Sequence, residues 1–189
     1  MFSWKVTKNK VENVIKERKI LALEIVGTIF IIFLGTALHF TFAFSGNNPV
    51  VGSLSAVNES VWEHLKLPFW PSFLWLLIMI IPLKSKVSNF FSAKTVGMIF
   101  MIAIIPIVFY SYTAFTKEIL AVDIATFMIA VIIGQLISYK LYRKEKSSRL
   151  AEVIAISIIV ALAIVFIIFT FNPPHLSIFM DTTTGQYGI

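Results

Sequence analysis

Residues 56–70, AVNESVWEHLKLPFW, gather side chains that can bind metal ions or transfer protons. Glu59 and Glu63 are four residues apart and would share one face of a helix, and Ser60 and His64 form a second such pair. Carboxylates and imidazoles in this pattern can ligate a zinc-like divalent cation. They can equally act as a general acid and base without a metal. The predicted catalytic residues are Glu59, Glu63, Ser60 and Asp123.

The histidines extend this pattern, because all three fall on one side of the membrane in the topology derived below. The predicted metal ligands are His39, His64, His175 and Asp181. His39 lies inside an apolar span, in GTALHFTFAF, and Asp123 lies about one turn into another. Ionisable groups at membrane depth are costly and are therefore candidates for function. A divalent metal such as zinc is the one cofactor that these residues support.

A structural explanation of the polar stretch stays open. Ser60 and Glu63 match the capping box S-x-x-E, which would begin a helix at the outer membrane surface. Pro68 and Pro71 suit the start of the span that follows. Capping needs only one acid, however, so it leaves Glu59 unexplained.

The elements that must position these residues are membrane helices. The chain has 189 residues, of which 58% are apolar, and a mean hydropathy of +0.87. Runs of about 18 or more mostly apolar residues are typical of transmembrane helices. We predict an all-α integral membrane protein with spans at residues 20–44, 67–83 (starting as early as Val61), 95–115, 119–141 and 150–171. The chain has no cysteine, which excludes disulfides and thiol chemistry.

The basic residues orient this bundle. If five spans alternate, 14 of the 16 Lys and Arg residues lie on the same side as the N-terminus. The positive-inside rule then places the N-terminus in the cytoplasm and the C-terminus outside, in a multi-pass protein of the cell membrane. Because this charge lies against the membrane, we expect the lipid bilayer as partner and no nucleic acid. Glu24 and Glu152, near helix ends among cations, are interpreted as solvated charges.

Two segments flank the transmembrane domain, residues 20–172. Residues 1–19 mix apolar side chains with six cations, as in a short amphipathic helix on the cytoplasmic headgroups. A merely basic tail is the alternative. Residues 173–189 are too apolar for a solvated tail, so we expect a lid that brings His175 and Asp181 toward the polar stretch. A frayed terminus is the alternative here.

The string N-E-S-x-W-E-H-x-K and the tail PPHLSIFMDTTTGQYG resemble an uncharacterised family of small prokaryotic multi-spanning membrane proteins. The resemblance covers essentially the whole chain and implies a topology but no activity. By residue type, the chain is also similar to alkaline ceramidases and adiponectin-receptor-like membrane hydrolases, which hold a zinc ion with three histidines. That similarity implies His39, His64 and His175 as ligands, Asp123 or Asp181 as acid and Ser60 as hydroxyl. The five spans and the histidine spacings depart from that pattern.

Three functions fit these observations, and whether the chain is an enzyme stays open. The first is a metal-dependent hydrolase with an outward-facing site for a lipid or another membrane-embedded substrate. The second is a protein that binds or transports an ion or small solute, which with five spans would need a homodimer to enclose a path. The third is an accessory subunit whose outer polar turn docks a partner protein.

Overall fold

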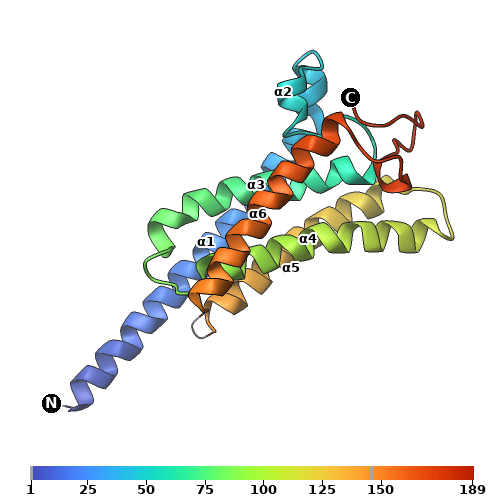
Figure 1. Cartoon of the computed structure of the whole chain (residues 1–189). Helices are drawn as coiled ribbons and strands as arrows, with labels where there is room; N and C mark the ends of the chain where they lie inside the picture. The colour runs from blue at the N-terminus through green and yellow to red at the C-terminus, as the bar shows by residue number, and fades with distance from the viewer. Residues whose placement is uncertain (1, 145–146) are drawn as a thin grey trace.

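A computed structural model describes residues 2–144 and 147–189. The described chain is helical apart from turns and one isolated β-bridge (Figure 1). Its elements are α1 (Phe2–Phe44), α2 (Pro49–Gly52), α3 (Val61–Leu83), α4 (Phe90–Thr113), α5 (Leu120–Tyr142), α6 (Arg149–Phe171) and the 3-10 turn η1 (Ser177–Phe179). Five helices of this part, α1 and α3 to α6, are long and apolar enough to cross a membrane. The predicted all-α membrane fold is confirmed.

The spans pack as α1 on α3 and α5, α4 on α5 and α6, and α3 on α4. α3 is the central span, because 56% of its apolar window is buried, against 22–33% in the others. α2, residues 53–60 and the C-terminal tail gather at one end, called the outer end here (Figure 1). The turn at residues 84–89 and the described residues 143–144 and 147–148 lie at the opposite, basic end.

The predicted N-terminal helix is present as the beginning of α1, which continues without a break into the first span and projects from the bundle (Figure 1). The predicted pattern of apolar and basic side chains at residues 1–11 lies outside the described side chains.

α3 begins at the earliest residue predicted for its span and α4 begins before its predicted span, each for an identifiable reason. α3 starts at Val61 because Ser60 is its N-cap and accepts a hydrogen bond from the Glu63 N–H at 3.3 Å. Pro68 and Pro71 therefore lie in its second and third turns, not in its first. α4 starts at Phe90, not residue 95, because a residue of α6 caps it. The Glu152 carboxylate accepts the backbone N–H groups of Phe91 at 2.8 Å and Ser92 at 3.1 Å, so Glu152 is not merely a solvated charge.

α1 and α3 approach closely beneath the outer end. Pro71 has no N–H, so the carbonyl group of Leu67 loses its intrahelical donor. Gly35 of α1 lies against that carbonyl: a Cβ atom there would stand 2.6 Å from the Leu67 oxygen and 2.7 Å from the ring of Phe127. Gly35, about one helical turn before His39, therefore lets the two helices approach closely.

Replacing Gly35 by alanine is expected to destabilise the bundle by about 1–3 kcal/mol, because the methyl group must push α1 away from α3 or α5. The free energy of unfolding in mixed detergent micelles measures the effect. Thr36→Ala, at an exposed neighbouring position, serves as the control. A Gly35→Ala protein as stable as the control would contradict this close approach.

Candidate metal site

Three of the predicted functional side chains meet at the outer end, where α1 passes the start of α3. The Nε2 atom of His64 lies 3.4 Å from Glu59 Oε2, and the Nε2 atom of His39 lies 4.0 Å from Glu59 Oε1. The two imidazole rings are 5.2 Å apart between centroids. One ligand atom from each residue can be chosen so that all three lie within 4.8 Å of one another. We call His39, Glu59 and His64 the outer cluster.

The backbone at the start of α3 orients His64. Its Nδ1 atom lies 2.8 Å from the carbonyl oxygen of Ser60 and can donate its hydrogen there. The lone pair of the neutral ring is then on Nε2, the nitrogen that faces Glu59. A histidine that binds a metal typically donates its other ring N–H to such an acceptor.

The C-terminal tail holds the backbone of Glu59. Its N–H donates to Asp181 Oδ2 at 3.4 Å, and its carbonyl group accepts from the Thr182 hydroxyl at 3.3 Å. Asn58 also donates to the carbonyl of Gly188, at 3.0 Å. The C-terminal tail therefore positions the backbone of the residue whose carboxylate belongs to the outer cluster.

A buried ion pair lies beside the outer cluster. Lys66 is completely buried, and its Nζ atom lies 2.6 Å from Glu63 Oε2 and contacts the Thr170 hydroxyl of α6. The same ammonium group donates to the carbonyls of Gly52 and Ser55, at 3.0 and 3.2 Å. The hydrogen bonds of Lys66 thus connect the turn that follows α2 with α3 and α6.

The outer cluster has the donors and the access that a metal site requires. Zinc bonds of 2.0–2.1 Å at tetrahedral angles separate two ligand atoms by about 3.3 Å. The nearest Glu59–His64 separation is already 3.4 Å, but the three ligand atoms together lie within 4.8 Å, so binding one ion requires side-chain shifts of up to roughly 1.5 Å. The side chains of His39, Glu59 and His64 are 26%, 46% and 32% exposed, so an ion or substrate can reach them. The contact with His64 holds the pKa of Glu59 below its ordinary value, so the carboxylate is ionised at neutral pH.

Residues 10–189 match the model of a protein family described as a family of unknown function, DUF6512. The chain therefore belongs to DUF6512. No match was found among curated proteins or among solved structures.

Several predicted site residues of this DUF6512 protein occupy other places. The His175 ring stacks on Tyr187, with centroids 4.5 Å apart, and is not in the outer cluster. Asp123 accepts a hydrogen bond from the Tyr112 hydroxyl at 2.8 Å. The Ser60 side chain caps α3 and is buried, and the Glu63 carboxylate contacts Lys66 and the Val57 N–H.

Asp181 organises the tail. Its Oδ1 atom accepts hydrogen bonds from the Thr183 N–H and hydroxyl, at 2.7 and 2.6 Å, and from the Thr184 N–H at 3.0 Å. Burial alone would raise the pKa of this carboxyl, but these hydrogen bonds and the one from Glu59 lower it from 3.8 to about 2. The ionised carboxylate therefore stabilises the tail against the start of α3.

Replacing Asp181 by asparagine is expected to release the tail at neutral pH, at a cost of about 2 kcal/mol in its local stability. Because the folded-state pKa is depressed, acid has the same effect on the wild-type protein. The stabilisation is complete above about pH 4 and is lost as the pH falls toward about 2. Hydrogen exchange of residues 181–189 measures the release, with Asp123→Asn as a matched control. Equal protection in both variants would contradict it.

A second polar cluster, buried between α1, α4 and α5, was not predicted from the sequence. Lys94 of α4 is fully buried and lies 3.1 and 2.9 Å from the two carboxylate oxygens of Glu24 in α1. Gln135 of α5 accepts from Lys94 at 2.6 Å and donates to the Glu24 carbonyl at 3.3 Å. The interpretation of Glu24 as a solvated charge is therefore wrong. The available signal was an acid inside an apolar span, but its partner could not be identified from spacing.

Proposed function

We propose that this DUF6512 protein is a metal-dependent membrane hydrolase whose outer cluster binds one divalent cation such as zinc. The observation that carries the proposal is the convergence of one ring nitrogen each from His39 and His64 and one Glu59 oxygen within 4.8 Å. Two imidazoles and one carboxylate leave a fourth tetrahedral position for water or substrate, the arrangement typical of catalytic rather than structural zinc.

The chemistry of such a site is hydrolysis of an ester, amide or phosphoester. His39, Glu59 and His64 would hold the cation, which would lower the pKa of a bound water, and the water oxygen would bond to the acyl or phosphoryl centre while the bond to the leaving group breaks. The proton of that water passes to the leaving group.

The position of the outer cluster supports a substrate drawn from the membrane. His39 and His64 lie in helices that are long and apolar enough to span the bilayer, close to the ends of those helices. Apolar side chains near the site are strongly exposed, including Phe40 at 50% and Phe44 at 85%. We therefore propose a lipid or another membrane-embedded substrate.

The proposal is tested on full-length protein purified in detergent, stripped with chelator and reloaded with zinc. One zinc ion per chain and zinc-dependent cleavage of fluorescent acyl-labelled phosphatidylethanolamine and ceramide in mixed vesicles are expected. Protein that binds no zinc would refute the site. Zinc bound without hydrolysis of either lipid would refute the activity proposed for these substrates.

A second candidate, binding and passage of a cation, is favoured by the ionisable Glu24–Lys94–Gln135 cluster within the membrane. Zinc uptake into protein-containing vesicles, without lipid cleavage, would favour this candidate. A role as an accessory subunit would instead be favoured by a partner protein that co-purifies with the wild-type chain and is lost with Glu59→Ala.

A further inference from the structure

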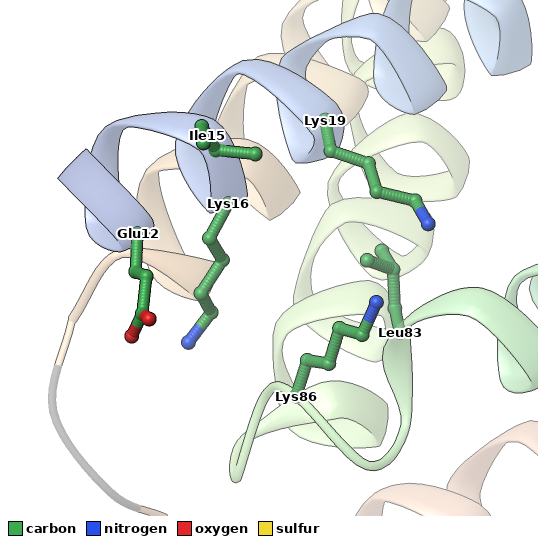
Figure 2. A pocket seen from close by; sticks show the side chains of 6 residues that line it. All are labelled: Glu12, Ile15, Lys16, Lys19, Leu83 and Lys86. Atoms are coloured by element: carbon green, nitrogen blue, oxygen red, sulfur yellow. The ribbon is translucent and has the colours of Figure 1, made fainter. Parts of the chain in front are cut away.

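A slot of about 410 Å³ opens at the basic end, between α1 and the turn that follows α3. Figure 2 shows the side chains that line it: Glu12, Ile15, Lys16, Lys19, Leu83 and Lys86. The ammonium groups of Lys19 and Lys86 come from different elements and point toward the same opening beside Leu83, whereas Glu12 and Lys16 lie farther along the slot (Figure 2).

We propose that this slot binds the headgroup of one anionic phospholipid. The phosphate lies between Lys19 and Lys86, and the acyl chains extend into the bilayer along the apolar part of α1, where Leu21 and Ile25 are exposed. Charge complementarity supports this occupant, because three of the six lining residues are cations and only one is an acid. The proposal is independent of the outer cluster at the other end of the bundle.

The depth of the slot fits a headgroup. The apolar part of α1 begins at Ile20, one residue after Lys19, and α3 ends at Leu83, three residues before Lys86. Both ammonium groups therefore stand where the hydrocarbon region gives way to water. This end is the one predicted to be cytoplasmic, where membranes carry anionic lipid.

Two observations separate this site from lysines that merely extend toward water. Within the described residues, no carboxylate lies in salt-bridge distance of Lys19 or Lys86, although both point toward one opening. Lys84, two residues from Lys86, does not line the slot, and its Nζ atom lies 5.5 Å from the centroid of the Phe91 ring. Lys84 therefore provides a matched control of equal charge in the same turn.

The test is native mass spectrometry of the full chain in neutral detergent, with dioleoyl phosphatidylglycerol or dioleoyl phosphatidylcholine added at equal concentration. We expect one phosphatidylglycerol retained per chain, at least tenfold more than phosphatidylcholine. Lys19→Gln combined with Lys86→Gln should lower this preference at least tenfold, and Lys84→Gln should change it less than twofold. Glu12→Gln should strengthen retention, because it removes the one acid among the described residues that line the slot.

Equal losses in Lys84→Gln and in the double variant would overturn the proposal, because general surface charge would then explain binding. Equal retention of the two lipids would overturn it as well. Glycerol phosphate, added as a competitor, separates lipid from free phosphate. If glycerol phosphate at equal concentration displaces phosphatidylglycerol, the slot is a phosphate site that does not need the acyl chain. Circular dichroism checks that each variant keeps its helical content, as expected for exposed positions.

Discussion

Replacing Lys94 by methionine is expected to lower the free energy of unfolding by about 3–5 kcal/mol, the largest effect of any single substitution considered for this protein. The change leaves the Glu24 carboxylate buried between α1, α4 and α5 without its cation, and Gln135 cannot neutralise it. Glu24→Met should lower the free energy of unfolding by about as much, because it leaves the ammonium group of Lys94 buried without its carboxylate.

The double variant Glu24→Met with Lys94→Met should recover most of the loss, because an apolar pair of similar volume needs no charge compensation. Unfolding in mixed detergent micelles gives the four free energies of this double-mutant cycle. The exposed pair of Glu17 and Arg143, 3.2 Å apart, is the contrast, and Arg143→Met should cost less than about 1 kcal/mol. A Lys94→Met protein within 1 kcal/mol of wild type would show that the ion pair contributes little.

The Glu24–Lys94 ion pair is a feature that could not be predicted from the sequence. Hydropathy identified all five spans, and capping chemistry identified the first residue of α3, because both signals are local. The pairing of Glu24 with Lys94 depends on how α1 and α4 pack, 70 residues apart in the chain. A single sequence does not show which helices lie side by side, so the pairing could not be predicted from it. Lys94 therefore resembled the other cations that flank apolar runs.

The outer cluster was predictable in part. Glu59 and His64 lie within one short stretch, and topology placed His39 on the same side, which was sufficient to propose that the three residues meet. Spacing could not separate Glu59 from Glu63, since both lie near the start of the same helix. The difference arises from Lys66, which is buried with Glu63 by the turn after α2 and by Thr170 of α6. Likewise, the stacking of His175 on Tyr187 depends on the fold of the tail.

Replacing Glu59 by glutamine is expected to weaken zinc binding at least 100-fold, because the amide removes the one anionic ligand between the two imidazoles. His64→Ala should have a similar effect, because it removes the Nε2 ligand oriented by the Ser60 carbonyl. Zinc affinity is measured by competition with a fluorescent chelator. His175→Gln is the matched control, a histidine of the same end that lies outside the outer cluster, and it should leave the affinity unchanged.

These variants also distinguish a metal site from a purely structural polar turn. Glu59 contacts the tail through its backbone N–H and carbonyl groups, which glutamine retains, so Glu59→Gln should unfold at nearly the same denaturant concentration as metal-free wild type. In a structural turn, the carboxylate would matter only through its contacts with His39 and His64, and added zinc would stabilise neither protein. With a metal site, zinc at 100 times its dissociation constant should stabilise the wild type alone, by about 2.7 kcal/mol. Equal zinc stabilisation of wild type and Glu59→Gln would place the ion elsewhere and remove the basis for hydrolysis at this cluster.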